Sequence, residues 1–188
     1  MPKYFDLDVR FWHEGLGEYS RALGFEKICC FATQCISGVE AKPKRLEDLR
    51  VDGRGKVLLV SSENTNLLLA ASKKREVDVL FIPTFQPNIA LMRITHEYEK
   101  AFEIPLNAII SSTGVQRAFL LSRIRFFLKV CNKYKVDFVI TSRASTKYLM
   151  RTPREMVAVG ELLGLTQDQA AKALSATPLS ILENKKLA

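Results

Sequence analysis

Short apolar segments alternate with amphipathic segments along the whole chain, and this alternation most constrains the fold. Strands are predicted at residues 4–8, 25–32, 56–61, 77–82, 101–104 and 136–141. Helices are predicted at 14–23, 64–74, 88–98 and from about 114 to 132, and three more begin near Thr152, Thr166 and Thr177. Six or seven strands separated by helices predict an α/β fold with a mainly parallel sheet covered by helices. A TIM-barrel-like architecture, as a compact or incomplete barrel, fits this spacing better than a doubly wound sheet.

The length of 188 residues predicts a single domain spanning 1–188. The longest apolar runs are strand-sized, so we expect no membrane span, and the N-terminal residues do not resemble a signal peptide. We therefore expect a cytoplasmic protein. The four cysteines, Cys29, Cys30, Cys35 and Cys131, form neither a CxxC pair nor a zinc-ligand pattern and are predicted to be reduced, buried thiols.

The positive charge is concentrated in one segment. The chain carries 28 Lys and Arg against 20 Asp and Glu, a net charge of +8. Residues 1–114 hold 15 basic and 15 acidic side chains, whereas residues 115–154 hold ten basic side chains and only Asp137 as an acid. Such a segment is typical of a surface that contacts phosphates. The alternative is a solvated face whose acidic partners come from elsewhere in the fold.

Seven basic residues of this segment are the candidates for phosphate contacts. On the predicted helix 114–132, Arg117, Arg125 and Lys129 share one broad face, and the apolar residues on the opposite arc are expected in the core. These core residues are Phe119, Leu120, Ile124, Phe127 and Leu128. The following loop and helix start contribute Arg143, Lys147, Arg151 and Arg154. Tyr148 in that loop is either a base-stacking side chain or a buried anchor.

Few residues suggest catalysis. His13 and His96 share no motif, and no phosphate-binding glycine loop is present. Asp6 and Asp8 extend in one direction from the first predicted strand, at the end where α/β barrels carry active sites. The two carboxylates could hold Mg²⁺ through waters, or could accept hydrogen bonds from the following turn. We predict no catalytic residue, no metal ligand and no cofactor.

Several segments together resemble a known family. They are Asn132-Lys133-Tyr134-Lys135-Val136, Ile140-Thr141-Ser142-Arg143-Ala144, Lys147, Arg151, Pro153-Arg154-Glu155-Met156, the run 159–165, Tyr4-Phe5-Asp6-Leu7-Asp8 and Ala101-Phe102-Glu103-Ile104. This sequence resembles the archaeal and eukaryotic ribonuclease P protein component 3 family. The similarity is strong over residues 100–182 and weak over 33–75, where this chain is shorter than typical members.

The resemblance implies a TIM-barrel-like fold related to PHP-type metal phosphoesterases, but a non-catalytic role. The implied protein binds the catalytic RNA of ribonuclease P, which removes the 5′ leader of precursor tRNA. The implied partners are ribonuclease P RNA, other protein subunits including a small RRM-like one, and precursor tRNA indirectly. Arg143 stands where family members often carry a small residue, which makes its contact role less secure than that of Lys147, Arg151 or Arg154.

Two other functions remain open at this point. One is a stand-alone PHP-like metal-dependent phosphoesterase that uses Asp6 and Asp8. However, the first strand reads Asp6-Leu7-Asp8-Val9 where a metal-binding relative would place histidines. The other is a barrel protein that binds a small molecule at the carboxyl ends of its strands.

Overall fold

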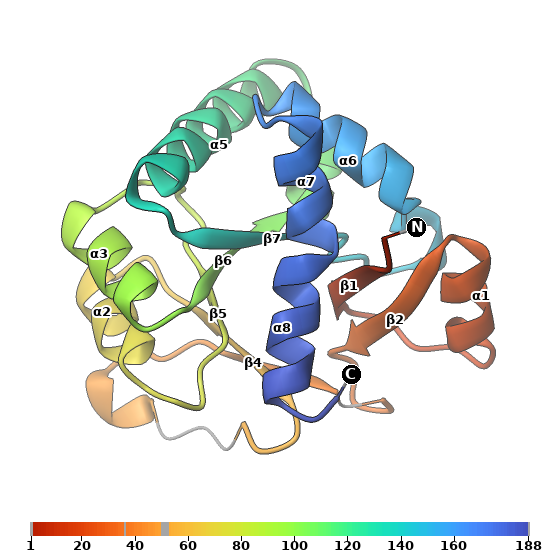
Figure 1. Ribbon diagram of the computed structural model, residues 1–188, viewed down its shortest axis with the longest axis horizontal. Coiled ribbons are helices and arrows are strands. Elements are labelled where there is room, and N and C mark those ends of the chain that lie inside the picture. Colours follow the sequence, from red (N-terminus) through yellow and green to blue (C-terminus); the bar gives the residue numbers. More distant parts are fainter. Residues whose placement is uncertain (1, 36, 50–52, 188) are drawn as a thin grey trace.

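Seven parallel strands surrounded by helices make up the described part of the chain (Figure 1), residues 2–35, 37–49 and 53–187 of a computed structural model. The strands are β1 (Tyr4–Val9), β2 (Phe25–Cys30), β3 (Gly38–Ala41), β4 (Val57–Ser61), β5 (Val79–Phe81), β6 (Ala101–Pro105) and β7 (Asp137–Thr141). β1 pairs with β2, and β3 to β7 form a second sheet in chain order.

Hydrogen bonds at the strand ends join the two sheets into a circular order. At one junction, Arg10 N–H donates to the Ala144 carbonyl over 2.8 Å, and a parallel bridge pairs Val9 with Ala144. At the other junction, Ser37 N–H donates to the Cys30 carbonyl over 3.0 Å, which brings the end of β2 to the start of β3. The strands therefore follow one another around an irregular barrel, as the TIM-barrel-like prediction requires.

The helices cover the outside of this barrel (Figure 1). They are α1 (Leu16–Ala22), α2 (Thr65–Ser72), α3 (Ile89–Glu97), α4 (Leu106–Ser111), α5 (Gly114–Tyr134), α6 (Pro153–Leu162), α7 (Gln167–Leu174) and α8 (Ala176–Asn184). α7 and α8 pack across β1 and β7. Capping boxes begin α6 at Thr152 and α7 at Thr166, which confirms both predicted helix starts.

The structure differs from the sequence prediction at two elements. β3 lies in a stretch that shows no apolar run, and α4 follows β6 directly without a separate start signal. In β3 Gly38 and Ala41 are buried, whereas Val39 and Glu40 are only partly buried, and β3 is the first strand of the five-stranded sheet. A continuous apolar run marks a strand covered on both faces, so an edge strand of mixed composition gives little signal.

The cysteine prediction is wrong for two of the four residues. Cys30 and Cys35 are joined by a disulfide in the turn after β2. Cys29 and Cys131 are free and buried as predicted, and burial raises the pKa of each thiol to about 12. In the described ranges, no helix is both long and apolar enough to cross a bilayer.

Candidate nucleic-acid interface

Two arginines and three carboxylates form a network at the carboxyl ends of the strands, which we call the strand-end cluster: Asp8, Arg10, Glu40, Glu103 and Arg143. Arg10 Nη2 lies 2.7 Å from Asp8 Oδ2, and Arg10 Nη1 lies 2.8 Å from Glu40 Oε2. Arg143 Nη2 lies 2.6 Å from Glu40 Oε1, and its Nη1 lies 3.2 Å from Glu103 Oε2. Glu40 therefore bridges the two guanidinium groups.

Burial sets the electrostatics of this cluster. The side chains of Asp8 and Glu103 are fully buried, and that of Arg143 is only 13% exposed. The Arg143 guanidinium also lies over the Phe81 ring, 4.2 Å from its centroid. Burial, together with the nearby Asp8 carboxylate, raises the pKa of Glu103 well above its usual value. Burial opposes ionisation of Glu40 as well, but the hydrogen bond from Arg10 and the charges of Arg10, Arg143 and Lys42 together outweigh it and lower the pKa of Glu40.

Asp6 lies beside the cluster and is completely buried. Its Oδ1 accepts hydrogen bonds from Ser142 N–H over 3.1 Å and from Asp8 N–H over 3.2 Å, whereas Oδ2 has no partner. Burial raises the pKa of Asp6 to about 7.

This geometry does not favour the metal-dependent phosphoesterase. The carboxylate of Asp8 accepts hydrogen bonds from the Arg10 side chain, and Asp6 accepts from the backbone N–H groups of Asp8 and Ser142. Neither partner of Asp6 lies in the turn after β1, so the predicted turn bonding is wrong for this residue. In the described part of the chain, no group of three or more His, Cys, Asp or Glu side chains is arranged to hold a metal ion. The Arg10 side chain occupies the Asp8 oxygens that a cation would need.

The predicted basic face of α5 is exposed, but two of its arginines also bind the protein backbone. Arg117 donates to the carbonyls of Ser112 over 2.7 Å and Ile110 over 3.2 Å, at the end of α4. Arg125 donates to the Leu162 carbonyl, at the last residue of α6, over 2.9 Å and 3.1 Å. Each arginine therefore stabilises a helix C-terminus. Lys129 is exposed, and no described residue pairs with it.

The loop after β7 presents the second predicted group. Lys147 and Arg154 are exposed and form no ion pair with a described residue. Arg151 is half buried and donates to the carbonyls of Tyr148 and Met150, each over 2.8 Å. Tyr148 is 77% exposed, and Lys147 Nζ lies 5.2 Å from its ring centroid. The exposure of Tyr148 excludes the buried-anchor alternative.

The structure separates Arg143 from the other six candidates. Its guanidinium is directed into the strand-end cluster, where its acidic partners come from β3 and β6. Sequence reasoning also placed Phe119 in the core, and this is wrong because Phe119 is 64% exposed. Val115 and Phe126 on the same helix are exposed too. Positions 115, 119, 122 and 126 lie on one face of a helix. The apolar residues at three of these positions form a second apolar stripe, which could have been recognised from their spacing in the sequence.

Comparison with known proteins identifies the family. Residues 41–188 match the family model of RNase P subunit p30. The chain belongs to this family. Among the p30 relatives, ribonuclease P protein component 3 of Methanococcoides burtonii is 34% identical over 87% of this chain and 69% of its own length. The corresponding protein of Methanothermobacter thermautotrophicus is 35% identical over 68% of this chain and 54% of its own length.

Other p30 relatives and two solved structures extend the comparison. The Methanosarcina barkeri component 3 is 31% identical over 80% of this chain and 66% of its own length. Thus about one third to nearly one half of each of these three relatives lies outside the aligned part.

A chain of the cryo-EM structure of archaeal ribonuclease P with mature tRNA has 21% identity and a TM-score of 0.71, covering 97% of this chain and 80% of that one. The Aspergillus niger ochratoxinase crystal structure has 14% identity and a TM-score of 0.56, covering 77% and 39%. Both structures support the fold of this p30 member.

Proposed function

We propose that this chain is a non-catalytic protein subunit of ribonuclease P that binds and stabilises the catalytic RNA during 5′-leader removal from precursor tRNA. Family membership supports a place in the ribonuclease P complex, and one observation supports RNA binding within that complex. Lys129, Lys147 and Arg154 are exposed cations that no described acid neutralises. An exposed cation with no acidic partner among the described residues remains available to a phosphate, and such contacts position RNA without reading its sequence.

The proposed RNA-binding surface, which we call the basic surface, comprises Arg117, Arg125, Lys129, Lys147, Arg151 and Arg154. Arg143 is left out because three carboxylates already surround its guanidinium. Tyr148 belongs to this surface as a stacking side chain for an unpaired base. Arg154 lies in the first turn of α6, where the helix N-terminus itself attracts anions.

We infer that the partners are ribonuclease P RNA, other ribonuclease P protein subunits including a small RRM-like one, and precursor tRNA indirectly, in the cytoplasm. The exposed apolar side chains of α5 support a protein partner. Val115, Phe119 and Phe126 are each more than half exposed, which is unusual for large apolar residues that follow one stripe of a helix.

Pull-down of the tagged full chain, followed by sequencing of the retained RNA, tests this function. We expect enrichment of ribonuclease P RNA and of tRNA precursors. The combined variant Lys147→Ala, Arg151→Ala, Arg154→Ala should lose most of this enrichment. The matched control Lys73→Ala removes an exposed lysine after α2, outside the basic surface, and should retain it. If the combined variant retains the same RNA as the wild type, in the same amount, the basic surface does not bind it. If the wild type retains RNA but no ribonuclease P RNA, the chain does not belong to that complex.

A further inference from the structure

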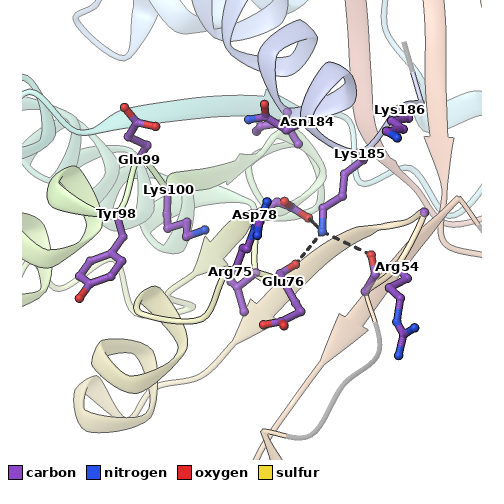
Figure 2. A pocket seen from close by; sticks show the side chains of 14 residues that line it. Arg54, Arg75, Glu76, Asp78, Tyr98, Glu99, Lys100, Asn184, Lys185 and Lys186 are labelled. Carbon is purple, nitrogen blue, oxygen red and sulfur yellow. Dashed lines mark hydrogen bonds and ion pairs between the residues drawn. The ribbon is translucent and has the colours of Figure 1, made fainter.

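A pocket lies at the amino-terminal ends of the strands, at the opposite end of the barrel from the strand-end cluster (Figure 2). It encloses about 580 Å³ between the C-terminus of α8, the turn before β4 and the residues that precede β5 and β6. Five cations and three carboxylates line it, so the lining has a net charge of +2. None of these residues belongs to the basic surface.

Lys185 fixes the wall of this pocket. Its ammonium donates to the Glu76 carbonyl over 2.8 Å and to the Gly53 carbonyl over 3.3 Å, and it lies 3.0 Å from Asp78 Oδ2. Asp78 also accepts a hydrogen bond from Leu58 N–H over 2.8 Å. Lys185 and Asp78 therefore satisfy each other and join α8 to β4 and β5. Figure 2 shows Lys185 reaching into the pocket from α8.

Lys100 enters the same pocket from the side of β6 and has no such partner (Figure 2). It is half buried, yet its ammonium forms no hydrogen bond or ion pair with a described residue. Burial lowers the pKa of Lys100, and the charge of Lys185 lowers it further, although Asp78, Glu76 and Glu99 act in the opposite direction. A desolvated ammonium without a partner is costly, and an oxyanion in the pocket would remove this cost.

Arg75 supplies a second cation without a described partner. It lines the pocket beside Glu76 and is exposed at the rim, where a planar guanidinium can bind two oxygens of one phosphate. A second cavity of about 590 Å³ shares Glu99, Lys100, Ile181 and Asn184 with the first. Lys100 therefore lines both cavities.

We propose that this pocket binds a phosphate-class oxyanion, with Lys100 and Arg75 as its direct ligands and Lys185 as the residue that holds the wall. A phosphate dianion would match the net charge of +2 of the lining. The phosphate belongs either to an RNA backbone or to a free phosphorylated small molecule. The proposal does not depend on the basic surface, because the two share no residue.

Titration of the full chain with inorganic phosphate, followed through the NMR signals of ¹³Cε-labelled lysines, tests the proposal. The signal missing from Lys100→Gln identifies Lys100. We expect this signal to shift saturably and the pKa of Lys100 to rise as phosphate binds. Lys100→Gln should weaken phosphate binding about tenfold or more, as followed by the Lys186 signal and by thermal stabilisation.

Lys73→Gln is the matched control, because Lys73 is an exposed lysine outside the pocket, and it should leave the phosphate affinity unchanged. Competition with a short oligouridylate separates the two phosphate sources. If the oligonucleotide displaces phosphate at Lys100, the ligand is an RNA backbone, and if it does not, the ligand is a free phosphorylated molecule. A linear, non-saturating response at Lys100, or equal affinities of the wild type and Lys100→Gln, would overturn the proposal.

Discussion

Arginines at the carboxyl end of the barrel fall into two groups that sequence alone does not separate. Arg143 and Arg154 lie eleven residues apart in the same basic segment. Arg143 is 13% exposed and surrounded by Asp8, Glu40 and Glu103, whereas Arg154 is exposed and has no described acidic partner. The difference teaches that the position of acids in the fold, rather than their position in the chain, decides whether a cation supports the barrel or remains available to RNA.

The largest effect that tests this comparison is on stability. Arg143→Ala removes the guanidinium that contacts Glu40 and Glu103 and leaves Arg10 and the exposed Lys42 beside the three carboxylates. We therefore expect it to lower the free energy of unfolding by about 3–5 kcal/mol. Arg154→Ala, at an exposed position, should change it by less than about 0.5 kcal/mol. Urea unfolding of the two variants beside the wild type gives both numbers. A similar small change in both would mean that the cluster does not stabilise the fold.

The next effect concerns pH. The pKa of Asp6 rises from 3.8 to about 7 on folding because the carboxyl is buried, so between these values the unfolded chain releases a proton that the folded chain keeps. Below about pH 4 Asp6 is protonated in both states, so its burial does not lower the free energy of unfolding. As the pH rises from about 4 towards 7, the free energy of unfolding falls, because the unfolded chain gains from ionising Asp6 and the folded chain does not. The total fall is on the order of a few kcal/mol.

Asp6→Asn removes this titration, so its free energy of unfolding should fall less steeply from pH 4 to pH 7 than that of the wild type. Thermal or urea unfolding across this range measures the slope, which does not depend on any constant loss of stability caused by the substitution. Parallel curves for the wild type and the variant would show that Asp6 titrates at an ordinary pKa in the folded protein.

The smallest effect concerns Tyr148 on the basic surface. If its exposed ring stacks on an unpaired base, Tyr148→Ala should weaken RNA binding by about 1 kcal/mol or slightly more, without affecting stability. Tyr148→Phe keeps the ring and should bind as the wild type does. Filter-binding titrations with ribonuclease P RNA separate the variants, and equal losses for Ala and Phe would point to the hydroxyl instead of stacking.

The sequence predicts the parts of this molecule whose signals are local. The runs at β4 and β7 are apolar because helices and the barrel interior cover both faces, and the capping boxes at Thr152 and Thr166 mark helix starts within four residues. β3 was missed because its strand character depends on pairing with β4. Arg143 was grouped with the RNA contacts because its partners Glu103 and Glu40 lie 40 and 103 residues away in the chain.

The exposed stripe on α5 shows a different limit of prediction from sequence. Sequence reasoning assigned Phe119 and Phe127 of this helix to the core because apolar side chains usually face inward. Phe127 does so and packs edge-to-face against Phe102, but Phe119 and Phe126 are exposed. A helix with apolar residues on two arcs buries only the one that faces the barrel, and the other remains available for a partner.

The salt dependence of RNA binding tests the central claim most directly. The logarithm of the affinity for ribonuclease P RNA is measured against the logarithm of salt concentration, for the wild type and for the combined variant Lys147→Ala, Arg151→Ala, Arg154→Ala. Each lost phosphate contact should flatten the slope by about 0.7 to 0.9, so loss of all three should flatten it by about 2 to 3. Identical slopes for the two proteins would contradict the claim that these three cations contact RNA phosphates.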